Sequence, residues 1–594
     1  MIAERLQALR NYMASKNLDA FIIPSTDPHQ SEYVADHWKL RAYFSGFTGS
    51  AGILVVTQNV AALWTDSRYF LQFEDECKDS EVTLFKQSIP HAPEHVAWLC
   101  DSFEKNATIG VDYRQFSKSQ IDYILSFTKP KNIKLQNEPH FAKEIWTDRP
   151  NLPNFEVTIH PLEFSGEATA SKLAKVQAEI QKQEANFYLF SSLDEIAWLF
   201  NIRSSDVDFT PLVTAYALVG LERTILFCNT NRFNENVIAV FEKLNISIKD
   251  YNSIASTLPG ITSGKKIVTD ASSLNYACFE AVNGSFIYQK SLVKRLKAIK
   301  NETEIAGSRD CMIKDGVALT KFFIWLEKEL ATKTISEYEI GRKLDSFRQQ
   351  QEYYTGESFP AIVGYKGNGA IIHYTAPEEN SAQVSNEGIL LVDSGAQYKN
   401  GTTDITRTVW LGGTPATKLK TAYTSVLKGY IELEQLQFPT GTSGAQIDAF
   451  ARVHLWKNGL DYPHGTGHGI GSFGMVHEPA QGFATGATTE RGTAPHLPNQ
   501  LTTIEPGCYV VGEFGIRTEN IVVSKIVNET TFGKFLGFEA LTLCYIDTNL
   551  LNYEELSTFE INWLNNYHQI VLNKLSPFLN EKEKQWLQDK CKTI

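Results

Sequence analysis

The sequence lacks several features that mark specialised classes of protein. Its eight cysteines are scattered and include no Cys-x-x-Cys pair, so neither a thiolate zinc site nor a disulfide framework is expected. Isolated thiols of this kind fit a reducing compartment, and we expect a cytoplasmic protein. The chain has neither an apolar signal-peptide core nor an apolar run of about 18 residues, so no membrane span or membrane partner is expected.

Blocks of one charge are missing as well. The chain carries 56 basic and 68 acidic residues, for a net charge of −12, and no basic cluster stands out. Nucleic acid is therefore not expected as a partner. Three common catalytic motifs are also absent: His477-Glu478 begins no His-Glu-x-x-His helix, residues 260–265 are one short of a phosphate-binding loop, and no Gly-x-Ser-x-Gly elbow occurs.

The sequence contains enough apolar residues for several hydrophobic cores. The chain has 594 residues, and single cores rarely extend beyond roughly 250–300 residues. Residues 19–128 alternate short apolar runs with helical stretches and include a hairpin around 57–59. Residues 166–298 show the same order of elements, so a duplicated α/β domain is one interpretation. The Pro-, Asn- and Lys-rich residues between them predict a domain boundary near 155–165.

The second half of the chain opens with helix-start patterns. Asn301 with Glu304, and Ser336 with Glu339, form capping-box pairs, which predict a helix over about 302–330 and another after residue 336. Strands are expected to dominate from Gly388, with helices at 417–436 and 444–458. The aromatic tail from about 545 to 594 is expected to be helical, as a packed extension or an oligomer contact rather than a catalytic part.

One buried strand is predicted to end in a carboxylate. Residues 389–392 are apolar and run directly into Asp393. Asn400-Gly401 then predicts a hairpin, and the β-branched segment after it contains Asp404. Asp393 and Asp404 are 11 residues apart across this hairpin and can point into one site. The alternative is that both only cap turns.

A glycine-rich stretch carries two histidines. Residues 463–471 place His464 and His468 among four glycines, and His477 follows nine residues after His468. Glycine allows the backbone to approach other groups closely and to take unusual dihedrals. A single histidine is usually a core or surface residue, but two in such a stretch favour a functional site.

Two further carboxylates follow apolar runs. Glu505 ends one run before a Pro-Gly turn, and Glu519 lies two residues after Arg517. Because strand side chains alternate, Arg517 and Glu519 are predicted to share a strand face, where the arginine would keep the carboxylate ionised and oriented. Taken alone, such a pair is usually a surface salt bridge.

Together these segments supply one imidazole and four carboxylates. Burying four carboxylates without cations costs many kcal/mol, and two divalent ions would neutralise them. Oxygen-rich ligation with one histidine suits Mn²⁺ and similar ions. Two ions roughly 3.5–4 Å apart are a common hydrolytic device. The sequence therefore predicts a dimetal centre, with Mn²⁺ as the expected ion.

These four elements, in this order, resemble the catalytic domain of the pita-bread metallopeptidases. Residues 301–540 look like that domain, and the whole chain is similar to the long, three-domain, cytosolic aminopeptidase P branch of the family. Residues 23–33, 64–70 and 193–201 match as well. The resemblance covers essentially residues 1–540 and is loose in the tail.

The resemblance implies a multidomain fold of mixed α/β and α+β type. Two creatinase-like α/β domains would occupy residues 1–158 and 159–300, a pita-bread catalytic domain 301–540, and a C-terminal extension 541–594. The implied activity is that of a metalloaminopeptidase, which hydrolyses the N-terminal Xaa-Pro bond through a hydroxide bridging two metal ions. Peptides with proline in second position would be the substrates, and the protein would be a homodimer.

The family pattern also implies a role for each ligand. Asp393 would chelate one ion, and His468 and Glu505 the other, while Asp404 and Glu519 would bridge both. Glu505 would in addition shuttle a proton of the attacking hydroxide.

Other residues would act on the substrate. By resemblance, His477 would stabilise the tetrahedral oxyanion, and His464 would position the residue after the scissile bond and protonate the leaving prolyl nitrogen. His373 and Arg68 would contact the substrate. Arg517 would not bind metal itself but would hold the Glu519 carboxylate in its orientation.

One departure from the family pattern follows His477-Glu478, where this chain has Pro479-Ala480 instead of Gly-Pro. The loop expected over 479–500 is rich in Gly, Thr and Ala. We expect it to reshape the rim of the pocket, and with it the preferred peptide length.

Several other members of the fold class compete with this interpretation. Methionine aminopeptidases lack the roughly 300 preceding residues, prolidases resemble only a two-domain version, and creatine-type amidinohydrolases would not need all five ligands. A prolidase-like dipeptidase shares the ligands and stays an alternative. So does a non-catalytic pita-bread module that binds peptides or histones, although such modules lose ligands that are all present here.

Overall fold

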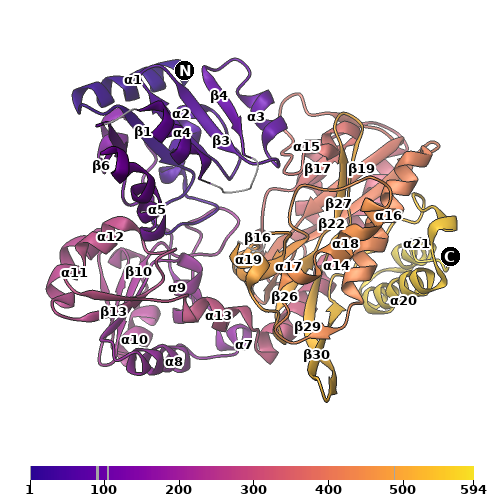
Figure 1. Ribbon diagram of the computed structural model, residues 1–594. Coiled ribbons are helices and arrows are strands. Elements are labelled where there is room, and N and C mark those ends of the chain that lie inside the picture. Colours follow the sequence, from indigo (N-terminus) through magenta and orange to yellow (C-terminus); the bar gives the residue numbers. More distant parts are fainter. Residues whose placement is uncertain (1, 88–92, 104–105, 487–488) are drawn as a thin grey trace. The chain divides into compact units, whose positions relative to one another are not determined.

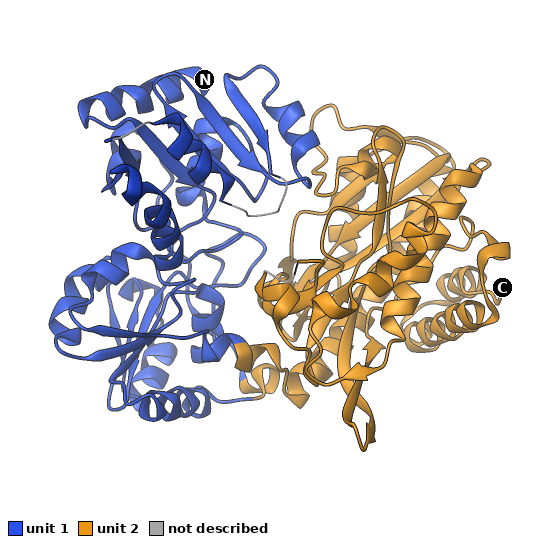
Figure 2. Ribbon diagram, in the orientation of Figure 1, with its two compact units in different colours: residues 1–161, 167–294 blue, residues 162–166, 295–594 orange. Residues whose placement is uncertain are grey.

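The computed structural model describes residues 2–87, 93–103, 106–486 and 489–594, which belong to two compact units (Figures 1 and 2). The N-terminal unit comprises Met1–Pro161 and Glu167–Lys294. The C-terminal unit comprises Leu162–Gly166 and Arg295–Ile594. The sequence predicts four domains, with boundaries at 158, 300 and 540, where the structure separates two units. The finer boundaries stay a prediction.

The N-terminal unit contains two six-stranded sheets with the same topology. In each, the first strand pairs antiparallel with a hairpin on one side and parallel with a later strand on the other. This repeat agrees with the interpretation of a duplicated α/β domain. The strand order of the first sheet is β4 (Val82–Lys86), β3 (Ala61–Thr65), β2 (Ile53–Thr57), β1 (Ala20–Pro24), β5 (Thr108–Val111), β6 (Lys134–Asn137). The strand order of the second sheet is β12 (Ile246–Lys249), β11 (Thr224–Phe227), β10 (Tyr216–Gly220), β8 (Phe187–Phe190), β13 (Lys266–Thr269), β14 (Ser285–Tyr288).

The central strand β1 is buried along its whole length because helices cover both faces of its sheet. Phe21 and Ile23 share a core with apolar residues of α1 (Ile2–Ser15). The alternate residues Ala20 and Ile22 share a second core with α4 (Glu94–Ser102) and α5 (Lys118–Thr128). A continuous apolar run is typical of a strand buried on both faces.

The C-terminal unit begins with the two helices that the capping-box pairs predict. In α14 (Glu302–Leu330) and α15 (Glu337–Arg348) each cap side chain accepts a hydrogen bond from the backbone N–H three residues later. The glutamate at that later position accepts a hydrogen bond from the backbone N–H of the cap residue. A third long helix, α16 (Thr417–Glu434), matches the prediction. The helix expected over 444–458 is divided into α17 (Gly444–Ile447) and α18 (Ala449–Trp456).

The strands of this unit form separate small sheets and one large sheet (Figure 1). A six-stranded sheet has the order β23-β30-β29-β26-β24-β25, a three-stranded sheet β17-β19-β22, another β16-β20-β21, and β27 pairs with β28. Their bounds are β16 (Tyr354–Glu357), β17 (Ile362–Tyr365), β19 (Gly388–Ser394), β20 (Ala396–Tyr398), β21 (Gly401–Thr402), β22 (Ile405–Gly412), β23 (Phe438–Pro439), β24 (Gly467–Gly469), β25 (Glu478–Phe483), β26 (Leu501–Ile504), β27 (Gly507–Val510), β28 (Phe514–Arg517), β29 (Asn520–Thr530), β30 (Gly533–Ala540).

The C-terminal tail packs as part of this unit. Its helices are α20 (Thr558–Leu575) and α21 (Glu581–Lys590). Trp563 donates to Glu434 of α16 at 2.9 Å, and Tyr567 stacks on Trp563 with ring centroids 5.4 Å apart. The expectation of a packed helical extension is therefore confirmed for the tail.

All eight cysteines lie in the described part of the chain and are free thiols. None of the helices described in the structure combines the length and apolar character that crossing a bilayer requires.

Candidate dimetal active site

Asp393 and Asp404 come from one antiparallel ladder. Asp393 lies near the end of β19 and Asp404 directly precedes β22, with Asp393 opposite Thr406 in the register. The turn between β20 and β21 lies one residue earlier than predicted, because Tyr398 pairs with Gly401. A side chain at Gly401 would meet the Cys311 sulfur 2.6 Å away, which explains glycine at this position.

The other three predicted ligands come from the large sheet. His468 lies in β24, Glu505 directly follows β26, and Glu519 directly precedes β29. The three strands are neighbours, and Ile504 of β26 lies opposite Asn520 of β29. The adjacent ends of antiparallel strands therefore bring Glu505 and Glu519 together.

Asp404, His468 and Glu519 form a potential metal site. One ligand atom from each lies within 4.8 Å of the others, and all three residues are buried. The Nε2 atom of His468 is 3.4 Å from Oδ2 of Asp404 and 3.7 Å from Oε1 of Glu505. Its Nδ1 lies 3.0 Å from the Gly469 carbonyl, which can only accept. In the neutral ring Nδ1 therefore carries the proton, and the Nε2 lone pair faces the carboxylates, as a metal ligand requires.

Two buried carboxylate oxygens are available to bind metal ions. Oδ1 of Asp393 and Oε1 of Glu519 accept no hydrogen bond from any described residue. Their second oxygens are bonded: Asp393 Oδ2 accepts from Arg517 at 2.5 Å, and Glu519 Oε2 accepts from the Thr406 hydroxyl at 2.7 Å. Buried oxygens without a partner are costly unless a cation satisfies them. The donor set therefore fits divalent metal ions.

The carboxylates also oppose one another's ionisation. Burial, and after it the charge of Glu519, raises the pKa of Asp404 well above its ordinary value. Burial and the charge of Glu505 do the same to the pKa of Glu519. Burial raises the pKa of Glu505 to about 7. Bound cations would take the place of these protons, because an opposite charge nearby favours the ionised carboxylate.

Arg517 has a different partner from the one predicted. The prediction of a strand face shared with Glu519 is wrong, because β28 ends at Arg517 and β29 begins only at Asn520. Arg517 instead donates directly to Asp393, and its Nε donates to the Thr406 hydroxyl at 3.0 Å. Since that hydroxyl donates to Glu519, the arginine reaches Glu519 through Thr406.

Family models match successive parts of the chain. A model of the Creatinase/Prolidase N-terminal domain matches residues 5–134, and a second model of that description matches 148–304. The model of Metallopeptidase family M24 matches residues 306–525, and that of the C-terminal region of peptidase M24 matches 534–594. The predicted fold class is thereby confirmed.

The Xaa-Pro aminopeptidase 1 of Dictyostelium discoideum is 38% identical over 614 residues, which span 100% of this chain and 97% of that protein. The chain belongs to the aminopeptidase P family. Aminopeptidase P1 of Arabidopsis thaliana is 35% identical and covers 99% of this chain, with 98% of its own length matched.

Solved structures agree with membership of the aminopeptidase P family. The X-prolyl aminopeptidase of Caenorhabditis elegans, a cytosolic enzyme with a di-nuclear active site, superposes with a TM-score of 0.94 at 33% identity. Each chain is covered to 100%. An Xaa-Pro dipeptidase from Bacillus anthracis, 22% identical with a TM-score of 0.50, covers only 63% of this chain and 97% of its own, and shares the fold alone.

His464 belongs to a hydrogen-bond network that includes Asp393 in this aminopeptidase P family member. Its Nδ1 is 2.8 Å from the Gly465 carbonyl and its Nε2 is 2.8 Å from the Tyr509 hydroxyl. Tyr509 also accepts from Arg517 at 2.6 Å. A chain of hydrogen bonds therefore runs from His464 through Tyr509 and Arg517 to Asp393. No local sequence pattern marks Tyr509, because its partner His464 lies 45 positions away along the chain.

His477 lies beside the histidine ligand of the family pattern. Its ring meets the His468 ring edge-on, with centroids 4.4 Å apart and an interplanar angle of 88°. It is half-buried. Glu478, the next residue, starts β25 and is buried. His477 therefore lies next to His468, and its action on substrate stays a prediction.

His373 and Arg68, the two other predicted substrate contacts, come from separate segments of the chain. His373 follows η5 (Lys366–Ala370), which packs closely on β28, since a side chain at Gly515 would meet the Gly369 carbonyl at 1.7 Å. Arg68 belongs to the N-terminal unit and forms an ion pair of 2.7 Å with Asp66. The substrate contacts of both residues stay predictions.

The segment after His477-Glu478 is more ordered than the predicted loop. Residues 478–483 form β25, and Glu490–Thr493 form the short helix α19. Pro479 and Ala480 thus lie in a strand. Residues 487–488, also in the predicted loop, lie outside the described part of the chain.

Proposed function

We propose that this chain is a metalloaminopeptidase that hydrolyses the bond between an N-terminal residue and a proline in second position. The observation that carries the proposal is the buried cluster of Asp404, His468 and Glu519, together with carboxylate oxygens that no described residue satisfies. Full-length similarity to Xaa-Pro aminopeptidases supports the class of substrate. It also favours this function over a prolidase-like dipeptidase.

The five predicted ligands divide between two ions. Asp393 would hold one ion, His468 and Glu505 the other, and Asp404 and Glu519 both. Four carboxylates with a single imidazole favour Mn²⁺. Two such ions would lower the pKa of a water molecule and so provide a nucleophile at neutral pH.

The protein residues around the ions would orient the reactants. Arg517 fixes the direction of the Asp393 carboxylate through a charge-assisted hydrogen bond. Glu505, half-buried beside His468, would take a proton from the attacking water. His477 would donate a hydrogen bond to the oxyanion that forms at the scissile carbonyl.

The surroundings of His464 suit a prolyl residue. Tyr462 and Tyr509 flank its ring, with centroids 4.9 and 5.4 Å away. A prolyl amide has no N–H to satisfy and presents a rigid apolar ring, which aromatic faces accept. His464 would position this residue and return a proton to its nitrogen, with His373 and Arg68 holding the rest of the peptide.

Two further properties belong to the proposal. A cytoplasmic location is supported by the free thiols and by the cytosolic C. elegans enzyme. A homodimer follows only from the resemblance and is tested by the mass of the protein in solution.

One assay tests the function. Metal-stripped protein is incubated with and without Mn²⁺, with Arg-Pro-Pro or Arg-Ala-Ala, and free arginine is measured for wild type and Asp404→Ala. Mn²⁺-dependent cleavage of the proline peptide only, lost in the variant, is the expected result. Cleavage of both peptides contradicts the proline requirement, and cleavage of neither under any metal favours a binding module.

A further inference from the structure

A buried arginine lies behind the strand end that carries Asp393. Arg348 is the last residue of α15 and is only 1% exposed. Its Nη2 donates to the Ser394 carbonyl at 3.4 Å and its Nη1 to the Gly395 carbonyl at 3.3 Å. These are the two residues that directly follow Asp393, so the guanidinium holds the backbone beside a predicted ligand.

The arginine is itself fixed by a buried carboxylate. Nε and Nη2 of Arg348 donate to the two oxygens of Asp315 in α14, at 2.8 and 3.0 Å. The Tyr398 hydroxyl donates to the same carboxylate at 3.0 Å. A bidentate pair defines the plane of the guanidinium, which a lysine ammonium cannot reproduce. Arg348 therefore has one orientation, and the carbonyls of Ser394 and Gly395 complete its hydrogen bonds.

The backbone at this point also touches the segment before Asp404. A side chain at Gly395 would lie 2.0 Å from the Thr403 carbonyl and 2.2 Å from the Ser358 hydroxyl. Ser358 donates its N–H to Gly395 and its hydroxyl to Thr403, at 3.1 and 2.9 Å. Ser358 therefore joins the Asp393 segment to the Asp404 segment, whereas the backbone partners of Arg348 are the carbonyls of Ser394 and Gly395.

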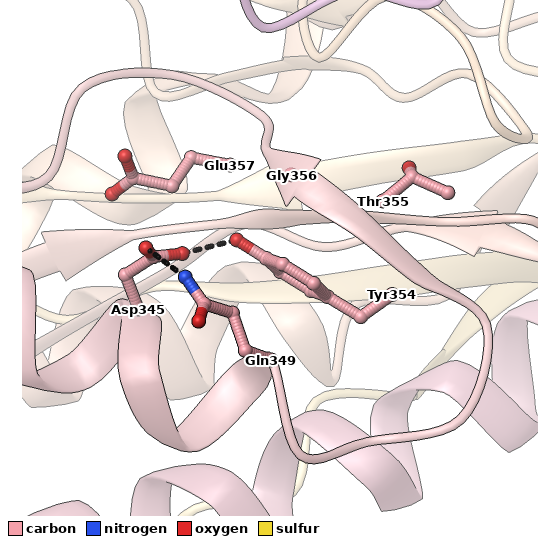
Figure 3. A pocket seen from close by; sticks show the side chains of 6 residues that line it. All are labelled: Asp345, Gln349, Tyr354, Thr355, Gly356 and Glu357. Carbon is pink, nitrogen blue, oxygen red and sulfur yellow. Dashed lines mark hydrogen bonds between the residues drawn. The ribbon is translucent and has the colours of Figure 1, made fainter.

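Residues around the end of α15 hold the arginine's helix against the β16–β20 ladder. Figure 3 shows Asp345, three residues before Arg348, accepting hydrogen bonds from Tyr354 and from Gln349, the latter at 2.8 Å. Tyr354 of β16 lies opposite Tyr398 of β20, with ring centroids 6.0 Å apart. Asp345, Gln349 and Tyr354 help to line a cavity of about 370 Å³, and none of the predicted ligands is among its lining residues.

We propose that Arg348 is a positioning residue for the metal site. Its guanidinium, oriented by Asp315, sets the backbone after Asp393 so that the Oδ1 atom of Asp393 faces the ion that this residue would chelate. The inference rests on the proposed dimetal function and deepens it. It distinguishes the two ions, because the hydrogen bonds of Arg348 within the described residues go to Asp315 and to the two residues that follow Asp393.

The test measures metal binding and not only activity. Mn²⁺ is titrated calorimetrically into metal-free, full-length wild type and Arg348→Lys. We expect one of the two binding events to weaken about 10–100-fold in the variant, as is usual for residues that orient a ligand, and the other to stay within about twofold. Saturating Mn²⁺ should then restore kcat for Arg-Pro-Pro, with KM unchanged.

Arg342→Lys is the matched control, on the same helix, with a side chain 55% exposed. It should bind both ions as wild type does. The proposal would be overturned if a folded Arg348→Lys protein bound Mn²⁺ as wild type does, or if its affinity for both ions fell equally.

Tyr398→Phe decides the question if Arg348→Lys does not fold. This variant keeps the aromatic ring and the charge and removes the hydroxyl that donates one hydrogen bond to Asp315. We expect about three- to tenfold weaker binding of the same ion, since one such bond contributes about 1 kcal/mol. Binding equal to that of wild type contradicts the inference. Wild type that binds two ions but leaves Arg-Pro-Pro intact would overturn the proposed function alone.

Discussion

Nη2 of Arg517 lies 2.5 Å from Oδ2 of Asp393, and both groups are buried. The same guanidinium reaches Glu519 through the Thr406 hydroxyl and donates to Tyr509. Burial opposes the charge, but Tyr509, Asp393 and the neighbouring carboxylates raise the pKa of Arg517 well above its ordinary value. One permanent cation thus links the strand of Asp393 to the loop of Glu519.

Replacing Arg517 by lysine should therefore loosen the metal site. Lysine keeps the charge but cannot donate to Asp393, Thr406 and Tyr509 at once. We expect metal affinity to fall about 10–100-fold, as measured by Mn²⁺ titration of the metal-free protein. Arg309→Lys, at a surface pair with Glu539, is the control and should change nothing. Equal affinities in both variants would contradict the role of Arg517.

Asp404→Asn should abolish activity and yet stabilise the metal-free protein. The substitution removes one of several buried carboxylates whose charges repel one another. Burial and the neighbouring charges both disfavour the ionised carboxylate, so its removal should raise the free energy of unfolding by on the order of 1–2 kcal/mol, since one pKa unit corresponds to roughly 1.4 kcal/mol. Urea denaturation in chelator at pH 8 measures the effect. A less stable variant under these conditions would mean that the carboxylates do not repel one another.

The metal-free protein should lose stability as the pH rises. The pKa of Glu505 is raised to about 7 in the folded state, so its contribution is present below the ordinary value of 4.5 and disappears as the pH passes through about 7. The loss is on the order of 3 kcal/mol, from roughly 1.4 kcal/mol per unit. Asp404 and Glu519, whose pKa values are also raised, extend the loss to higher pH.

The measurement compares urea denaturation of metal-free wild type and Glu505→Gln between pH 5 and 8. The difference in free energy of unfolding between them isolates Glu505 from other titrating groups. We expect wild type to lose more stability than the variant over this range. Parallel curves would show that Glu505 titrates normally.

Glu478→Ala should destabilise the C-terminal unit. Glu478 forms ion pairs with Lys300 and, at 2.9 Å, with Lys297, and the lysine side chains are 1% and 2% exposed. Removing one partner of a buried ion pair costs about 3–5 kcal/mol. Activity should fall too, because Glu478 directly follows His477.

A surface pair provides the control for this variant. Glu513 pairs with Lys418 at 2.9 Å, and both side chains are more than half exposed. Glu513→Ala should change the free energy of unfolding by less than about 1 kcal/mol. Similar urea midpoints for the two variants would refute the importance of burial at Glu478.

Local patterns along the chain predicted much of the fold. The capping boxes at Asn301 and Ser336 identified the starts of α14 and α15, because a cap is satisfied by residues only three positions away. The helix expected over 444–458 is instead divided at Asp448, whose side chain bonds Arg452 and Thr466. The hydrogen bond with Thr466, 18 positions away, is a contact that local patterns do not contain.

The candidate ligand residues could be predicted from the sequence because each lies at a strand end next to an apolar run or among glycines. By itself the sequence determined which residues are available as ligands, the family and the order of the domains. Only the tertiary structure decided their partners: that Arg517 bonds Asp393 rather than Glu519, that Tyr509 joins it to His464, and that Arg348 holds the backbone after Asp393. The physical reason is that these hydrogen bonds join strands and helices tens of residues apart, so that strand pairing, rather than sequence spacing, sets their geometry.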